Sequence, residues 1–199
     1  MKIVLGTGNE HKVFEINQIV KSKLGANAEN IEFISPPAGF DPIEDGSSFE
    51  ENSYIKAKEA SNLSGMISLA DDSGLCIEAL NGAPGLYSAR YAGTQDEKIE
   101  RVLRELDGKE NRKAKFVCCM TLVNAEGEIL HRTKGECFGQ IIKERRGVNG
   151  FGYDPIFLPD GYDITIAEMS DEGKNSISHR GRALDKMLDY LQKELLKQQ

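Results

Sequence analysis

The apolar and polar positions of the first seventy residues alternate between the periodicities of strands and helices. Short apolar runs bounded by turn residues are typical of buried strands, and apolar residues at every third or fourth position are typical of helices. Asn9 provides a cap for the first helix, and Ser48 with Glu51 forms a capping box for the second. The pattern predicts strands at residues 2–6, 31–34 and 67–70 and helices at residues 10–24 and 49–63. This β-α-β-α-β order favours an α/β architecture.

The pattern changes after Gly74, where β-rich runs replace the regular alternation. We expect a strand at 75–80, a helix at 95–106, a hairpin of strands at 114–124 and 128–142, a loop-dominated stretch at 147–175 and a terminal helix at 178–197. The terminal helix places Leu184, Leu188 and Leu195 on one apolar face. Together these elements predict a two-lobed α/β fold around a long mixed β-sheet with flanking helices. We expect a single domain over residues 1–199, with the active-site cleft between its lobes.

One segment carries unusual chemistry, because the apolar residues 67–70 lead directly into Asp71, Asp72, Ser73 and Gly74. Ligands of open α/β sheets bind just beyond the carboxyl ends of such strands. Two adjacent carboxylates repel each other unless a positive group, commonly a metal ion, offsets their charge. The sequence therefore predicts a divalent-metal site at this position. Mg²⁺ is the first candidate, because it takes one or two carboxylates plus substrate phosphates.

Charge and cysteine content narrow the function class. The 199 residues carry a net charge of −7, which disfavours binding of a nucleic-acid polymer but allows a small anionic ligand. Four cysteines without Cys-x-x-Cys spacing and three scattered histidines indicate free thiols in a reducing cytosol rather than a zinc site. The first residues are too short for a signal-peptide core, and no apolar run approaches membrane length. The sequence therefore predicts a cytoplasmic protein with no membrane partner.

Two segments of the first half could bind phosphate or metal. A strand-to-helix turn with exposed N–H groups, a hydroxyl and an ammonium suits phosphate, although an ordinary turn has the same composition. This turn consists of Thr7, Gly8, Asn9, Glu10, His11 and Lys12. Asn52 and Lys56 share a helix face and could reach one ligand. Glu44 could join Asp72 around a metal, but spacing alone does not separate it from Asp41 or Asp45, which are also common turn residues.

Two segments of the second half could bind a nucleotide base. Phe151, Gly152, Tyr153 and Asp154 can offer a ring face to a flat heterocycle, or the aromatic rings can plug the core. The segment 174–182 places Lys174, His179 and Arg180 near the start of the terminal helix. The helix dipole disfavours cations at that end unless a carbonyl oxygen or an anion is bound there. This misfit points to a ligand.

Taken in order, five motifs resemble the inosine triphosphate pyrophosphatase family, the Ham1/RdgB-like pyrophosphatases of non-canonical purine nucleoside triphosphates. The motifs are Thr7-Gly8-Asn9-x-x-Lys12, Phe49-x-Glu51-Asn52-x-x-x-Lys56, Asp71-Asp72-Ser73-Gly74, Phe151-Gly152-Tyr153-Asp154-Pro155 and Ser178-His179-Arg180-Gly181. The likeness runs from residue 3 to about residue 190 and includes the segment 82–91.

The resemblance implies Mg²⁺-dependent hydrolysis of ITP, dITP and XTP to the monophosphate and pyrophosphate by a two-lobed α/β enzyme, usually a homodimer. It implies Asp72 as general base and, with Glu44, as metal ligand. Residues Thr7 to Lys12 would hold phosphates, and Ser73 would also contact the substrate. The remaining nucleotide-binding residues, mostly around the base, would be Phe151, Gly152, Tyr153, Asp154, Lys174, His179 and Arg180.

These roles agree with the chemistry of phosphoryl hydrolysis, which needs positive charge on the transferring group and an oriented water. Donors from His179 and Arg180 would favour the C6 carbonyl of hypoxanthine and xanthine over the amine of adenine. The sequence does not locate the group that rejects guanine. Two other interpretations remain, a Maf-like nucleotide pyrophosphatase and a catalytically silent nucleotide sensor. The ordered motifs at 151–155 and 178–181 argue against the first, and the Asp71-Asp72 pair argues against the second.

Overall fold

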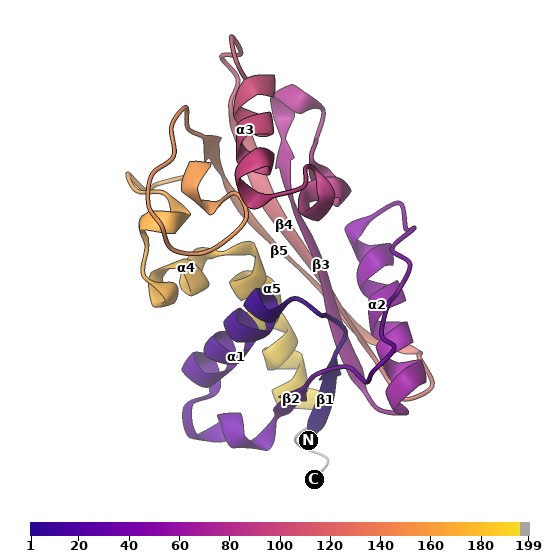
Figure 1. The fold of residues 1–199 in the computed structure, drawn as a ribbon. Helices are drawn as coiled ribbons and strands as arrows, with labels where there is room; N and C mark the ends of the chain where they lie inside the picture. Colours follow the sequence, from indigo (N-terminus) through magenta and orange to yellow (C-terminus); the bar gives the residue numbers. More distant parts are fainter. Residues whose placement is uncertain (196–199) are drawn as a thin grey trace. The chain divides into compact units, whose positions relative to one another are not determined.

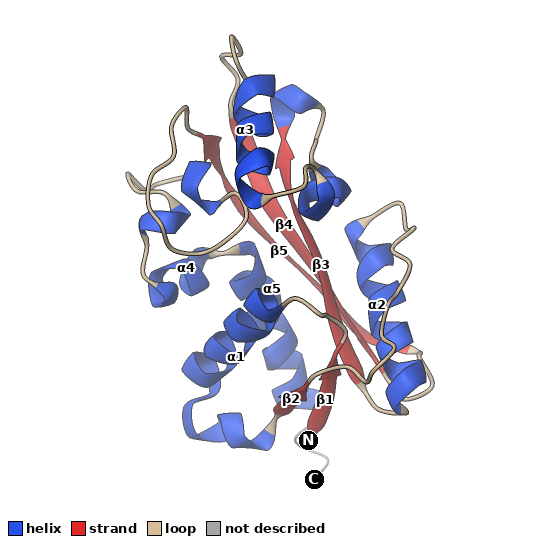
Figure 2. Ribbon diagram, viewed as in Figure 1, coloured by secondary structure: helices blue, strands red, loops and turns tan. Residues whose placement is uncertain are grey.

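The computed structural model describes residues 1–195, without the side chains at positions 26, 29 and 195. Figure 2 shows a mixed sheet with helices around it, in the strand order β2-β1-β3-β4-β5-β6. The strands are β1 (Lys2–Leu5), β2 (Glu32–Ile34), β3 (Ser68–Ile77), β4 (Lys113–Val123), β5 (Ile129–Ile141) and β6 (Phe157–Pro159). β1 pairs in parallel with β2 and β3, whereas β5 and β6 are antiparallel. The predicted mixed α/β fold is therefore confirmed.

The helices are α1 (Glu10–Leu24), α2 (Phe49–Ser64), α3 (Gln95–Glu105), α4 (Asp171–Ile177) and α5 (His179–Tyr190). Short 3₁₀ segments lie at 25–30, 78–80, 85–90, 154–156 and 166–168, and a π-helical turn at 191–195 follows α5. Within the described residues, no helix has the length and apolar content needed to cross a membrane.

The chain forms two compact units, each with its own core. The first unit contains residues 1–72, 118–135 and 180 onward, and the second contains residues 73–117 and 136–179. Strands β3, β4 and β5 each contribute one part to each unit.

The first unit packs helices on both faces of its part of the sheet. Side chains of α1 and α5 form one cluster with Leu69 of β3, and the two helices lie side by side in Figure 1. Ala70, the next residue, packs instead with Ala57 of α2. Successive side chains of a strand point to opposite faces of its sheet. Asp71 therefore continues the α1 and α5 face, and Asp72 continues the α2 face.

Local sequence explains where these helices begin and end. Asn9 caps α1, since its side chain accepts hydrogen bonds from the backbone N–H groups of His11 and Lys12. Ser48 caps α2 through the N–H of Glu51, and Gly65 ends α2 with a φ of 65°.

The second unit is built around apolar residues of β3, β4 and α3. Leu75 and Ile77 of β3 pack with Ile99 and Val102 of α3, and all four are at most 1% exposed. The capping box of Thr94 and Glu97 fixes the start of α3.

Several boundaries differ from the sequence-based expectation. The expected strand end at residue 70 and the separate strand at 75–80 are wrong, because β3 runs from Ser68 to Ile77 through both aspartates. The expected hairpin is confirmed as β4 and β5, whereas β6 lies in the stretch expected to be loop. The expected terminal helix is confirmed as α5, which begins at His179, whereas α4 lies in the stretch expected to be mostly loop and ends before Ser178, which is extended. The predicted end of the terminal helix at Lys197 lies outside the described residues.

Candidate active site

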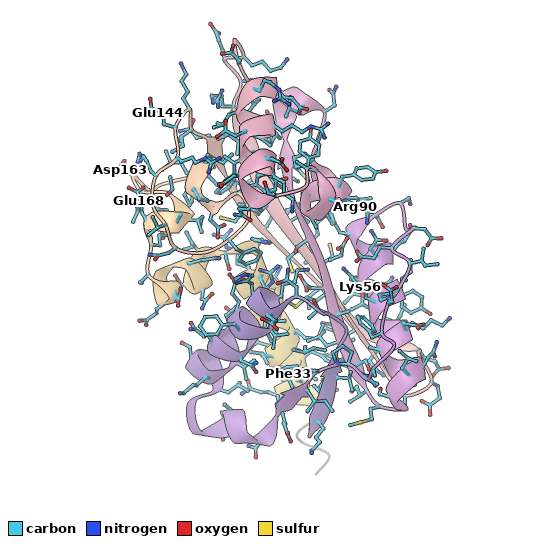
Figure 3. All side chains as sticks on the ribbon, in the orientation of Figure 1. Phe33, Lys56, Arg90, Glu144, Asp163 and Glu168 are labelled. Carbon is cyan, nitrogen blue, oxygen red and sulfur yellow. The ribbon has the colours of Figure 1, made fainter. Side chains whose placement is uncertain are left out.

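Two polar side chains contact Asp72 in the first unit, and one of them also contacts Glu44. Lys56, labelled in Figure 3, places its Nζ 2.8 Å from Asp72 Oδ1 and 3.0 Å from Glu44 Oε2. Asn52 Nδ2 lies 3.3 Å from the other oxygen of Asp72, Oδ2. Asn52 and Lys56 are one turn apart on α2, so both face the same strand. The sequence predicted that Asn52 and Lys56 could reach one ligand, and in the structure both side chains contact the carboxylate of Asp72.

The electrostatics of this group leave an excess of negative charge. Burial raises the pKa of Asp72 above its usual value, and Glu44 adds to the shift while Lys56 opposes it. Burial alone would lower the pKa of Lys56, but Asp72, Asp71 and Glu44 outweigh it and raise that pKa. Two carboxylates, Asp72 and Glu44, thus share one ammonium. A further cation near them would balance the charge.

Asp72 and Glu44 fit the requirements of a magnesium ion. Across the part of the chain that the structure describes, no group of three or more His, Cys, Asp or Glu side chains gathers to hold a metal. Mg²⁺ does not need such a group, since it binds through one or two carboxylates and completes its shell with phosphates and water. Both carboxylates lie within hydrogen-bond distance of one ammonium, so they already converge on a cation.

Asp71 faces the opposite side of the sheet and has its own cations. Its Oδ2 lies 2.9 Å from Lys12 Nζ and 3.3 Å from Arg180 Nη2, and Arg180 Nη1 donates to Glu15. The side chains of Asp71 and Arg180 are 1% and 2% exposed. Burial alone would raise the pKa of Asp71, but Lys12 and Arg180 hold it well below its usual range. Asp71 therefore has ion-pair partners of its own on the face of β3 opposite to Asp72.

The turn before α1 is partly satisfied by its own side chains. Asn9 Oδ1 accepts from His11 N and Lys12 N at 3.0 and 3.4 Å, and Thr7 Oγ1 accepts from Asn9 N at 3.2 Å. The N–H groups of His11 and Lys12 therefore have an acceptor within the turn itself. The exposed residues of this turn are Gly8, Asn9, Glu10 and His11. The ammonium of Lys12 reaches Asp71 from the same turn.

The aromatic loop of the second unit combines both of the roles considered for it. Tyr153 is 3% exposed and its hydroxyl donates to Ser88 O at 3.0 Å, so this ring belongs to the core. Phe151 is partly exposed, and Lys174 Nζ lies 4.8 Å from the centre of its ring. Asp154 Oδ2 accepts from Phe151 N at 2.9 Å and from Lys174 Nζ at 2.8 Å. The loop is therefore anchored by Tyr153 and Asp154 while part of Phe151 remains accessible.

Three further predicted residues belong to the second unit, His179, Gly152 and Ser73. His179 stacks on Phe116, with ring centroids 4.8 Å apart and planes 13° apart. Gly152 adopts a φ of 66°, a conformation that favours glycine. Ser73 is a half-buried residue of β3, directly after Asp72 in the chain.

Sequence reasoning missed Glu15, which is 8% exposed and holds Arg180. A signal was present, because Lys12 and Glu15 are three residues apart and therefore share a helix face. The sequence did not show that Arg180, 165 residues beyond Glu15, returns to the same place.

Comparisons with known proteins identify relatives over nearly the whole chain. A family model described as the Ham1 family matches residues 3–190. A curated relative named dITP/XTP pyrophosphatase from Desulfotalea psychrophila is 46% identical over 185 residues, covering 92% of this chain and 81% of the relative. Another with that name, from Treponema denticola, is 44% identical over 192 residues, covering 92% of this chain and 95% of the relative.

Two solved structures have the same fold. A Ham1 protein from Coxiella burnetii matches with a TM-score of 0.85 and 40% identity, covering 97% of this chain and 99% of that one. The Ham1 protein of Staphylococcus aureus matches with a TM-score of 0.85 and 36% identity, covering 98% of this chain and 100% of that one.

Proposed function

The chain belongs to the Ham1 family, and we propose that it hydrolyses the non-canonical purine nucleoside triphosphates ITP, dITP and XTP to the nucleoside monophosphate and pyrophosphate. Curated relatives at 46% and 44% identity are named dITP/XTP pyrophosphatases, which supports this activity. The observation that carries the proposal is the position of Asp72. Its carboxylate is buried in contact with Lys56 and Asn52, and it shares Lys56 with Glu44.

Asp72 is the proposed general base. It accepts a proton from the water that attacks the α-phosphorus, and pyrophosphate leaves as the bond to the β-phosphate breaks. Its raised pKa, caused by burial and opposed by Lys56, brings it closer to the pKa that a base needs near neutral pH. Lys56 holds one of its oxygens in place.

Mg²⁺ is the proposed cofactor, with Asp72 and Glu44 as its ligands. When bound, the ion supplies positive charge next to the phosphates, where the transition state needs it. Lys12 and the exposed part of the turn at 7–12 are proposed to hold the phosphates. The side chain of Lys12 is 14% exposed and its ammonium is already fixed on Asp71, so it needs little ordering when phosphate binds.

The proposed base contacts are Phe151, Lys174, His179 and Arg180. Phe151 offers a ring face, and the other three residues are hydrogen-bond donors suited to a C6 carbonyl. Adenine places an amine there, which cannot accept a hydrogen bond from them, so discrimination of about 1–3 kcal/mol for each lost hydrogen bond is expected. Tyr153 and Asp154 act by holding the loop, Gly152 by its backbone conformation. Ser73 is proposed to contact the nucleotide next to Asp72.

A product assay tests the proposal. The protein is incubated with ITP, dITP, XTP, GTP or ATP and Mg²⁺, and pyrophosphate and orthophosphate are measured separately. We expect pyrophosphate from the first three nucleotides and little turnover of ATP. Orthophosphate as the only product, or no turnover of ITP, would contradict the proposal. Omission of Mg²⁺ with a chelator present is expected to abolish turnover.

We further propose that the two units serve one catalytic domain, and that the enzyme is a cytoplasmic homodimer. Four free cysteines among the described residues are consistent with a reducing compartment. Sedimentation velocity measures the assembly state, and a single species at the mass of one 22.0 kDa chain would contradict the dimer.

A further inference from the structure

We propose that Asn52 is a positioning residue that ties the loop carrying Glu44 to the carboxylate of Asp72. The inference deepens the proposed function, because it rests on Asp72 and Glu44 serving together as cation ligands. It assigns to Asn52 no contact with the substrate. Its role is to fix the distance and direction between the two carboxylates.

The amide of Asn52 has one defined orientation. Asn52 is 1% exposed, and its Oδ1 accepts a hydrogen bond from Gly46 N at 2.9 Å. A backbone N–H can only donate, so the oxygen of the amide must face Gly46. The NH₂ group must then face Asp72, whose Oδ2 lies 3.3 Å away. Each end of the amide thus has a partner of the matching kind.

The loop is fastened directly after Glu44. A Cβ on Gly46 would lie 2.6 Å from Asn52 Oδ1 and 2.8 Å from the Cβ of Glu51, so only glycine approaches α2 this closely. The next residue, Ser47, donates from its N and Oγ to Glu51 at 2.6 and 2.7 Å. The loop is therefore held against the start of α2 at Gly46, only two residues after Glu44.

A neutral amide is suited to this task. Asp72 uses one oxygen for Lys56 and the other for Asn52, so the plane of its carboxylate is fixed from both sides. A second ammonium in place of Asn52 would also fix the plane, but it would neutralise the charge that attracts a cation. The amide positions Asp72 and leaves that charge available. Groups that orient metal ligands in this way typically change metal affinity by about 10–100-fold when they are removed.

The experiment measures binding of Mn²⁺, a spectroscopic substitute for Mg²⁺, to the nucleotide-free protein by electron paramagnetic resonance. We expect Asn52→Ala to weaken Mn²⁺ binding by about 10-fold or more. In steady-state assays, it is expected to raise the Mg²⁺ concentration needed for half-maximal turnover of ITP. The KM for ITP at saturating Mg²⁺ should change by less than about threefold, since Asn52 does not bind the nucleotide.

Ser53→Ala is the matched control. Ser53 is the next residue of α2, is fully buried, and shares a hydrogen bond of 2.7 Å with Thr121. Its removal costs a buried hydrogen bond on the same helix without touching Asp72 or the loop. We expect a similar fall in melting temperature for the two variants and unchanged Mn²⁺ affinity for Ser53→Ala. An equal loss of Mn²⁺ affinity in both variants would overturn the inference.

Gly46→Ala keeps the inference testable if Asn52→Ala does not fold. Its new Cβ would lie 2.6 Å from Asn52 Oδ1 and 2.8 Å from the Cβ of Glu51, so the contact between the loop and Asn52 is lost while the amide itself is retained. We expect the same loss of Mn²⁺ affinity. If Asn52→Ala and Gly46→Ala bind Mn²⁺ like the wild type while Asp72→Asn does not, the inference is wrong, although the site is real. The product assay with ITP decides the proposed function separately.

Discussion

The two faces of β3 hold adjacent aspartates in opposite electrostatic situations. On one face, Asp71 and Glu15 meet Lys12 and Arg180, two negative and two positive charges in a buried network. On the other face, Asp72 and Glu44 share the ammonium of Lys56. The charges of the first group are paired within the protein, and the second group is where we propose that a cation binds.

This difference supports the proposed division between a structural role for Asp71 and a catalytic role for Asp72. The pKa of Asp71 is held low by its cations despite burial, so it stays charged and serves as an ion-pair partner. The pKa of Asp72 is raised by burial, which suits a group that accepts a proton. Neighbouring residues of one strand can therefore have separate tasks because the pleat directs them to different partners.

Asp72→Asn is expected to have the largest effect on activity. The variant keeps a hydrogen-bonding side chain toward Lys56 but loses the base and the charge for the metal. We expect kcat for ITP to fall by about 10²–10⁴-fold, the range for removal of a general base. Binding of ITP in the presence of Ca²⁺, measured by calorimetry, should survive. Turnover near the wild-type rate would remove Asp72 from the catalytic role.

Asp71→Asn is expected to reduce stability most. Removing one partner of a buried ion pair leaves uncompensated charge and costs about 3–5 kcal/mol. Urea unfolding at pH 7 measures the free energy of unfolding, and Asp72→Asn serves as the matched comparison one residue away. A larger loss of stability in Asp72→Asn than in Asp71→Asn would invert the proposed division between the two faces.

The elements of this fold were predictable where local periodicity decided them. The bounds of α1 match the expectation because an Asn cap, apolar spacing and Gly25 all agree. The path of β3 was not predictable, since acidic residues are disfavoured in strands. Asp71 and Asp72 are tolerated there because Lys12, Lys56 and Arg180 come from distant parts of the sequence. Tertiary ion pairs thus overrode the local signal.

The candidate site shows the same limit. The pairing of Asn52 and Lys56 followed from helix spacing, and the structure gives them one partner, Asp72. The burial of Tyr153 did not follow, because its anchor is the carbonyl of Ser88, 65 residues away. Sequence motifs named the candidate residues, but only the packing showed which of them hold others in place.

Arg180→Ala tests whether the balanced face also contributes to base selection. We expect the ratio of kcat/KM for ITP over that for ATP to fall by about 5–150-fold, corresponding to about 1–3 kcal/mol from one lost donor. The loss of charge also removes one cation from Asp71 and Glu15, so stability falls as well. Assays are therefore made at a temperature where circular dichroism shows the variant folded.

The double variant Glu15→Gln/Arg180→Met separates the two effects. It removes one negative and one positive charge and leaves Asp71 paired with Lys12. We expect it to be more stable than Arg180→Ala but to have the same reduced ratio of ITP to ATP turnover. Recovery of the wild-type ratio would show that Arg180 acts only as an ion-pair partner.

The pH dependence of stability is the smallest expected effect and sharpens the comparison through its sign. Asp71 has a lowered pKa when folded, so the unfolded chain binds more protons, and the stability that Asp71 contributes is present above its unfolded pKa of about 3.9. That contribution is lost as pH falls below about 4 toward the folded pKa. Asp72 has a raised pKa when folded, so its charge costs stability at neutral pH and acidification relieves that cost.

Urea unfolding from pH 7 to pH 3.5 should therefore show the stability gap between wild type and Asp71→Asn shrinking. The Asp72→Asn variant should instead lose stability relative to wild type as the pH falls. Parallel curves for the two variants would mean that both faces of β3 hold their carboxylates in the same electrostatic state.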